Sequence, residues 1–161
     1  MIEISENLFV GRKEDLQKFS LKDDAIVHAT NTFHYEIMGW NRTTNKPPKK
    51  HPNYLVWENK NRLSLNWVDG AAYLYEWSGA ETFIRVLDFI DSWIASRKVF
   101  IHCDQGMSRS PTLGLLYLAK RKKIIPNDNF FSASQEFRKI YPMYQPKGIA
   151  DYVNQHWLEI N

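Results

Sequence analysis

The sequence has little cysteine: one residue in 161, at position 103. A single thiol cannot form an internal disulfide, and it cannot build a zinc site from several cysteines. A lone thiol is also typical of proteins from a reducing compartment. We therefore expect neither a disulfide framework nor a cysteine-rich metal centre, and we turn below to what the one cysteine does.

Long apolar runs and a large charge excess are absent as well. No stretch reaches the roughly 18 apolar residues of a membrane span, and residues 1–16 lack the basic start and apolar segment of a signal peptide. The sequence thus predicts a cytoplasmic protein with no membrane partner. The net charge of +3 suits an anionic ligand but is small for a dedicated nucleic-acid binder.

The composition, 43% hydrophobic and 14% aromatic, is enough for a core, and the length predicts a single domain over residues 1–161. The pattern of apolar segments predicts an α/β fold, with a mixed central sheet flanked by helices. Strands are expected at 7–11, 25–30, 54–57, 62–67 and 98–102, and helices at 13–19, 78–98, 110–122, 132–141 and 146–160.

Three local patterns refine this prediction. Ser78 followed by Glu81, and Ser132 followed by Gln135, have the spacing of N-terminal helix caps. Residues 41–53 contain three prolines and four Lys or Arg residues, so we expect a surface loop there. A flap over a binding pocket is the alternative for that loop.

The cysteine lies in the stretch "HCDQGMSRS" (102–110), between a predicted strand end and a predicted helix start. Backbone N–H groups of such a loop, together with a helix N-terminus, form a site for an anion. Gly106 would allow the turn, and the planar guanidinium of Arg109 would match two phosphate oxygens. The same positive surroundings favour the thiolate form of Cys103, which would be a nucleophile aimed at phosphorus.

Two neighbours of this loop have expected supporting roles. The ring of His102 would hydrogen-bond backbone carbonyls and hold the loop in shape. Ser110 would donate a hydrogen bond to the sulfur when the sulfur is the leaving group. The structural alternatives are a core histidine for His102, a helix N-cap for Ser110, a surface arginine for Arg109 and a buried inert thiol for Cys103.

This stretch resembles the active-site loop of the cysteine-based protein phosphatases, H-C-x-x-G-x-x-R-[ST], and "HCDQGMSRSPT" is similar to the dual-specificity version. "EISENLFVGRKEDL", "FIDSWIASRKVFIHC" and "FRKIYPMYQPKGIADYV" look like further segments of that family, so only residues 41–60 look like a local elaboration. The resemblance implies the protein-tyrosine-phosphatase-like fold and a cysteinyl-phosphate intermediate, with no metal or other cofactor. The residues expected to bind substrate are Asp104, Gln105, Gly106, Met107, Ser108 and Arg109.

The resemblance also implies a general acid on a loop upstream of the cysteine. Asp69 lies 34 residues before Cys103, directly after a predicted strand, and Gly70 follows it. We assign the acid to Asp69, with Glu76 as its rival and Asp104 as a weaker candidate. An ordinary Asp-Gly turn is the structural alternative. Two further acids, Asp88 and Asp91, are expected on the solvated face of a helix.

The expected substrate is phosphotyrosine in a protein or peptide, with phosphoserine and phosphothreonine as a further class. A phosphate- or sulfate-type anion should occupy the loop. An RNA 5′-phosphatase or a small-molecule phosphatase is the alternative, which the basic segments 41–50 and 120–123 keep open. A non-catalytic phosphate-binding module is the second alternative. Tyr35 and Trp40 are candidates for the pocket wall, with core packing as the other interpretation.

Overall fold

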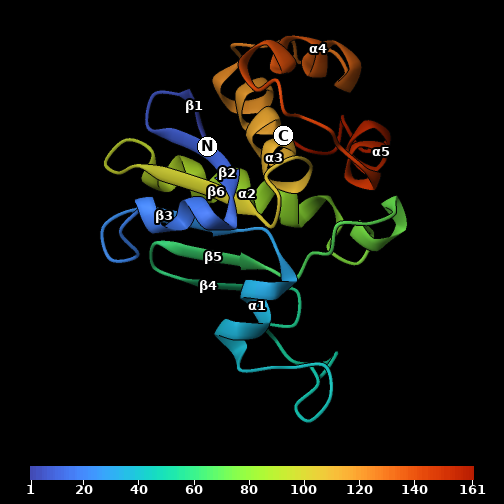
Figure 1. The fold of residues 1–161 in the computed structure, drawn as a ribbon. Helices are drawn as coiled ribbons and strands as arrows, with labels where there is room; N and C mark the ends of the chain where they lie inside the picture. Colours follow the sequence, from blue (N-terminus) through green and yellow to red (C-terminus); the bar gives the residue numbers. More distant parts are fainter.

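The computed structural model describes all residues 1–161 and contains one six-stranded sheet of order β1-β2-β6-β3-β5-β4 (Figure 1). The inner strands β2, β6, β3 and β5 are parallel, whereas the edge strands β1 and β4 are antiparallel to their neighbours. This mixed sheet confirms the predicted α/β class. The strands are β1 Ile2–Ser5, β2 Leu8–Arg12, β3 Ala25–His28, β4 Val56–Asn59, β5 Arg62–Leu65 and β6 Val99–Cys103.

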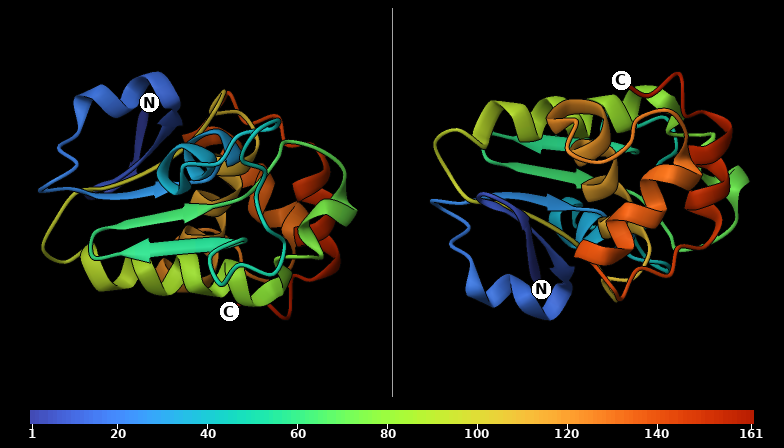
Figure 2. Two further views of the ribbon diagram at one scale, coloured as in Figure 1. Left: turned by 90° about the horizontal axis from the view of Figure 1, so that it is seen from below. Right: turned by 90° about the horizontal axis from the view of Figure 1, so that it is seen from above.

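Helices cover both faces of the sheet, and Figure 2 shows α2 and η1 on opposite sides of it. None of the helices has the length and apolar character required to span a bilayer. The α-helices are α1 Asn31–Met38, α2 Gly79–Trp93, α3 Arg109–Tyr117, α4 Phe130–Ile140 and α5 Gly148–Gln155. Shorter helical segments are the 3₁₀ turns η1 Lys13–Lys18 and η2 Ala72–Tyr75 and the π-helical turn η3 Leu118–Lys122.

The layers that cover the two faces of the sheet differ in thickness. One face contributes Val10, Val27 and Ile101 to a cluster of 34 buried hydrophobic residues that also includes side chains from α2, α3, α4 and α5. On the opposite face, Phe19 stacks on Phe100 with ring centroids 4.3 Å apart, and Phe33 from α1 stacks on His28 at 5.2 Å. Because side chains alternate along a strand, this thinner face also receives His102, the residue before Cys103.

Most predicted elements are present, with shifted ends. The strand predicted at 54–57 runs from Val56 to Asn59, so only residues 60 and 61 separate it from β5, and the helix predicted to reach residue 98 ends at Trp93. The strand Ile2–Ser5 and the helix Asn31–Met38 were not predicted. The latter is short and of mixed polarity, so tertiary packing rather than an amphipathic pattern defines it.

Helix α2 begins at Gly79, directly after Ser78 as predicted, but neither of the predicted side-chain caps is formed. Ser78 has helical backbone angles, and its hydroxyl accepts a hydrogen bond from Trp67 Nε1 at 2.8 Å instead of capping α2. Helix α4 begins earlier than predicted, with Asn129 as its N-cap accepting from Ser132 N at 2.8 Å. Helix α3 begins at Arg109, so Ser110 lies inside it and is not its N-cap.

The loop predicted at 41–53 contains no helix or strand, which confirms that prediction. Its first turn is organised by Asn41, whose side-chain oxygen accepts from three successive backbone N–H groups, those of residues 43, 44 and 45. Further along, Lys49 Nζ lies 5.6 Å from the ring centroid of Trp77. The loop therefore reaches the segment that precedes α2.

Candidate active site

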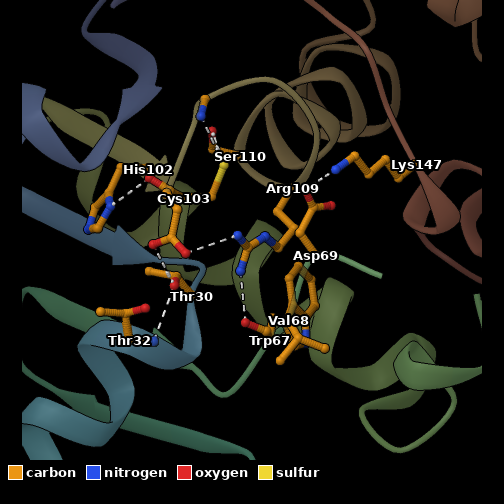
Figure 3. A network of polar contacts seen from close by, with 12 residues as sticks. Thr30, Thr32, Trp67, Val68, Asp69, His102, Cys103, Arg109, Ser110 and Lys147 are labelled. Atoms are coloured by element: carbon orange, nitrogen blue, oxygen red, sulfur yellow. Dashed lines mark hydrogen bonds and ion pairs between the residues drawn. The ribbon is translucent and has the colours of Figure 1, made fainter. Parts of the chain in front are cut away.

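Cys103 is the last residue of β6, at the carboxyl end of the parallel strands, where ligands of α/β sheets commonly bind. Its thiol is buried, with 2% of the residue exposed. The Sγ atom accepts a hydrogen bond from Gly106 N at 3.3 Å and lies 3.2 Å from Ser110 Oγ (Figure 3). The Gly106 N–H is thus a donor to the sulfur, whereas Ser110 Oγ directs its proton to Gly11 O and can donate to the sulfur only after releasing that oxygen.

Gly106 is required by the close packing of this loop on β2. Its φ is +70°, and a Cβ atom there would lie 2.9 Å from the carbonyl carbon of Gly11 and 3.0 Å from its oxygen. Glycine is the residue that adopts this conformation without a steric penalty. The same Gly11 oxygen accepts from Ser110 Oγ at 2.9 Å, so β2 holds the loop and the start of α3 together.

The carbonyl groups of the loop are turned away from the sulfur. They accept hydrogen bonds from residues later in the chain: Gly106 O from Tyr141 Oη at 2.6 Å, Met107 O from Gln145 N at 2.8 Å, and Ser108 O from Thr112 Oγ1 at 2.7 Å. In a trans peptide the next N–H points opposite to the carbonyl. The N–H groups of residues 107, 108 and 109 therefore face the other side, where they form a nest for an anion.

Arg109 completes this nest from the first turn of α3. Only 3% of the residue is exposed, and its Nη1 donates to the backbone oxygen of Trp67 at 2.8 Å. Nη2 lies 3.4 Å from Asp104 Oδ2, and Nε is buried without a hydrogen-bond partner. The Trp67 contact fixes the guanidinium, which leaves its Nε–Nη2 edge for a bidentate anion.

Asp104 lies between this guanidinium and the end of β3. Its Oδ1 accepts from Thr30 Oγ1 at 2.9 Å, and its Oδ2 is the Arg109 contact (Figure 3). Both carboxylate oxygens thus have a partner, and Asp104 helps to hold the Arg109 guanidinium in position. This arrangement does not favour the weaker assignment of Asp104 as the general acid.

Asp69 reaches the same site from the segment between β5 and η2, and Figure 3 shows its carboxylate beside Arg109. Its Oδ2 lies 3.3 Å from Lys147 Nζ, while its Oδ1 is buried without a partner. The segment packs closely on the start of α5, because a Cβ atom on Gly148 would lie 2.3 Å from Gly70 O. Lys147 and Gly148 were missed by the sequence analysis, since only the folded chain brings them to Asp69.

The rival acid Glu76 lies elsewhere. It is exposed and pairs with His156 of the C-terminal segment, with 3.3 Å between Glu76 Oε1 and His156 Nε2. The structure thus brings Asp69, and not Glu76, to the cysteine loop. No group of three or more His, Cys, Asp or Glu side chains is arranged to hold a metal ion.

The basic run 120–123 is largely engaged inside the protein. Lys120 is buried, with Nζ donating to Trp157 O at 2.6 Å. Arg121 pairs with Asp88 at 3.0 Å and also with Asp91, so these two helix acids are bridged to η3 rather than simply solvated. Two of the four cations in 120–123 therefore have partners within the protein, whereas Lys122, Lys123 and most of the segment 41–50 are exposed.

A hollow of about 280 Å³ lies next to the Asp69 segment. The residues lining it are mostly apolar and aromatic, with Lys49 at its edge, and include Tyr35, Tyr54, Trp67, Tyr73 and Trp77. Tyr35 thus lies in a pocket wall, whereas Trp40 packs against His51 and Tyr54. Trp67 lines the hollow and its backbone oxygen anchors Arg109, so the hollow adjoins the residue that fixes the guanidinium.

His102 is fully buried on the thin face of the sheet. Its Nδ1 lies 3.4 Å from Cys103 O, in accord with the predicted bond to a backbone carbonyl, and its Nε2 lies 2.6 Å from Nδ1 of His28. The second contact was not predicted, because it depends on β3 lying beside β6 with His28 opposite His102. Burial lowers the pKa of His102 to about 4.

This lowered pKa predicts a loss of stability in mild acid. Between pH 6.5 and 4 the unfolded chain binds a proton at His102 and the folded chain does not, so unfolding becomes easier as the pH falls. A shift of this size corresponds to about 3 kcal/mol in the free energy of unfolding. Urea unfolding at pH 7 and at pH 4.5 measures it. His102→Asn keeps an N–H near the Nδ1 position but does not titrate, so an equally large loss in that variant would contradict the assignment.

Comparison with known proteins agrees with this architecture at low sequence identity. No protein-family model matches the chain. The human tyrosine phosphatase-like serine/threonine/tyrosine-interacting protein is 17% identical, with a TM-score of 0.64 over 98% of this chain and 95% of that one. Tk-PTP in its active form is 18% identical, with a TM-score of 0.62 over 98% and 95%. PTPMT1, solved in complex with PI(5)P, is 15% identical, with a TM-score of 0.57 over 98% and 94%.

These likenesses confirm the predicted fold: a dual-specificity and tyrosine phosphatase fold that extends over nearly the whole chain. They leave the activity to be argued from the site, because one such fold supports different functions. One of the three structures is that of a phosphatase-like interacting protein, and another holds an inositol lipid.

Proposed function

We propose that this chain is a cysteine-dependent phosphatase that hydrolyses phosphate monoesters, with phosphotyrosine in proteins as its preferred substrate. The observation that carries the proposal is the meeting of a buried thiol, a set of inward-facing amides and the unpartnered Nε of Arg109 at one end of β6. A buried guanidinium with a free donor is costly unless an anion binds it. A tetrahedral phosphate fits this set of donors.

In the first step the Cys103 thiolate attacks phosphorus, forming an S–P bond while the P–O bond to the leaving group breaks. The electron pair of that bond goes to the leaving oxygen, and the Asp69 carboxyl group gives it a proton. Arg109 and the loop N–H groups hold the equatorial oxygens and stabilise the charge that they carry in the transition state. The product is a cysteinyl-phosphate.

In the second step water attacks the phosphorus of this intermediate. The Asp69 carboxylate takes a proton from the water, the S–P bond breaks, and its electron pair returns to the sulfur. Ser110 Oγ, 3.2 Å from Sγ, stabilises the departing thiolate by donating a hydrogen bond to it. To do so it must release Gly11 O, to which it donates in the structure. Arg109 supplies the positive charge that the reaction needs, so the scheme requires no metal.

The surroundings of the site favour a peptide over RNA. The aromatic hollow beside Arg109 has room for an apolar side chain next to the phosphorylated residue, and burial of such a side chain is favourable. The internal engagement of Lys120 and Arg121 weakens the case for a polyanionic ligand. The Cys103 sulfur attacks phosphorus in phosphotyrosine, phosphoserine and RNA 5′-phosphate alike. The choice among these substrates therefore depends on the side chains that surround the site.

Assays on para-nitrophenyl phosphate, phosphotyrosine and phosphoserine peptides and 5′-triphosphorylated RNA test the proposal. We expect turnover of the first two and the highest kcat/KM for a phosphotyrosine peptide. An aromatic residue beside the phosphotyrosine should lower KM about fivefold relative to alanine, since an aromatic contact contributes about 1 kcal/mol. Trp77→Ala should remove that difference. Preferential cleavage of RNA would favour the alternative phosphatase, and phosphate binding without turnover would favour a non-catalytic module.

Asp69→Asn is expected to lower kcat by about 10²- to 10⁴-fold, the usual contribution of a general acid. The loss should be smaller for substrates with good leaving groups, because these need less protonation. The alkaline limb of the pH–rate profile, along which a general acid loses its proton, should flatten. Para-nitrophenyl phosphate and an alkyl phosphate, compared over pH 4.5 to 8, provide the measurement.

Glu76→Gln is the matched control, since it removes an upstream carboxylate that lies outside the site. It should leave both the rate and the pH profile unchanged. A flattened profile in Glu76→Gln with an intact one in Asp69→Asn would reverse the assignment.

A further inference from the structure

A row of polar groups crosses the thin face of the sheet and ends at the cysteine loop. His28 of β3 and His102 of β6 are register partners, and Nδ1 of His28 lies 2.6 Å from Nε2 of His102. On the other side of His28, Arg62 of β5 directs Nε and Nη2 at its Nε2, at 3.1 and 2.9 Å. Both histidines are completely buried, and only His102 belongs to the sequence pattern that identified the loop.

The donors and acceptors in this row fix the proton on each ring. Arginine can only donate, so Nε2 of His28 must present its lone pair, and the proton of the neutral ring is on Nδ1. This N–H donates to Nε2 of His102, which must accept. The proton of His102 is therefore on Nδ1, the atom that faces Cys103 O at 3.4 Å.

Both rings are neutral near pH 7. Burial, with smaller contributions from the other charges, lowers the pKa of His28 well below its usual value and that of His102 to about 4. The charged groups that face the row are Arg62, its neighbour Glu36 on α1, and Asp104 and Arg109 at the loop. A doubly protonated His102 would set an N–H against the N–H of His28, so the geometry itself opposes that charge.

We propose that Arg62 and His28 are positioning residues that hold His102 in its Nδ1–H tautomer and thereby orient the Cys103–Asp104 peptide. With Cys103 O bound to the ring, the N–H of Asp104 points to the opposite side, toward the anion nest. In the other tautomer a ring lone pair would face the carbonyl oxygen, and repulsion would turn this peptide. The inference deepens the proposed function, because it concerns the same cysteine, but it can be tested without turnover.

Arg62→Gln and Arg62→Met separate the hydrogen bond from the charge. Glutamine keeps an N–H donor but carries no charge, whereas methionine provides neither. The readout is the rate of alkylation by iodoacetamide from pH 4.5 to 9, which reports thiolate formation at Cys103 alone, since the chain has one cysteine. We expect the midpoint to move up by about one pH unit in Arg62→Met, a tenfold loss of thiolate at a fixed pH below the midpoint, and to stay in place in Arg62→Gln.

An unmoved midpoint in Arg62→Met, or equal shifts in both variants, would overturn the proposal. His28→Asn and His28→Leu form a second pair, in which only asparagine retains a donor near the Nδ1 position. Asparagine should preserve the midpoint and leucine should raise it. Circular dichroism identifies any variant that fails to fold.

Long-range ¹H–¹⁵N spectra of histidine-labelled wild-type protein test the premise even if the Arg62 and His28 variants unfold. The chain has five histidines, and His102→Asn assigns the signal of interest. At pH 7 we expect His102 to show the Nδ1–H pattern. An Nε2–H pattern would exclude the proposed positioning role of Arg62 and His28. Neither this result nor the alkylation rate requires phosphatase activity, so failure of the proposed function and failure of this inference are distinguishable.

Discussion

Cys103→Ser is expected to reduce turnover of para-nitrophenyl phosphate and phosphotyrosine peptides by about 10⁴- to 10⁶-fold, as removal of a nucleophile does in enzymes with a covalent intermediate. The serine hydroxyl is protonated at neutral pH and has no nearby base in this site to ionise it. The donors for the anion, Arg109 and the loop N–H groups, are untouched by the change. Binding should therefore survive while chemistry stops.

Three measurements give this result its meaning. Initial rates establish the loss of turnover, calorimetry with inorganic phosphate reports the anion site, and thermal unfolding reports the fold. The expected combination is no measurable turnover, phosphate affinity within about threefold of wild type, and a similar melting temperature. Turnover that persists in Cys103→Ser would exclude the cysteinyl-phosphate mechanism, even if the protein proved to be a phosphatase.

The loop could be predicted from sequence because its parts are contiguous. Strand end, glycine turn, Arg109 and helix start fall within about a dozen residues, so spacing alone places them together. The contacts that complete the site come from separate elements. Trp67 O, Thr30 and Lys147 reach the loop from the end of β5, the end of β3 and the start of α5. No local pattern encodes these distances, since they depend on strand order and helix packing.

The helices and strands likewise divide into those that a local sequence pattern reveals and those that depend on distant contacts. Buried central strands such as Val99–Cys103 are mostly apolar and are recognisable one at a time. The helix Asn31–Met38 buries two polar residues, Asn31 and His34, and the His34 ring bonds Ser64 Oγ and Asn53 O, so the helix shows no apolar stripe in sequence. Ser78 illustrates the opposite error, in which a valid capping pattern is present but the indole of Trp67 takes the hydroxyl.

The polar row behind the loop is the least visible part in sequence. A lone histidine in an apolar strand is commonly a satisfied core residue, and His28 fits that description as well as it fits a positioning role. The parallel register of β3 with β6 sets His28 opposite His102, and the parallel pairing of β3 with β5 brings Arg62 alongside His28. Arginine, which can only donate, fixes both tautomers at once.

Arg109→Lys should lower kcat by about 10³-fold while retaining the positive charge, a loss in the range found for transition-state donors and arginine fingers. The guanidinium does two things at once here: Nη1 holds Trp67 O, and the Nε–Nη2 edge faces the anion nest. An ammonium group is a point donor on a flexible chain, so it can keep one of these contacts but not the planar fork.

Arg85→Lys is the matched control, because Arg85 is half exposed on α2 and pairs only with Glu58 at the surface. It should change kcat by less than about twofold, as expected for a surface ion pair. Arg109→Lys should lower kcat more than it changes KM. The planar guanidinium matters most in the transition state, where charge spreads over the equatorial oxygens. A kcat within threefold of wild type would mean that charge alone suffices, and the bidentate geometry inferred from the unpartnered Nε would then be wrong.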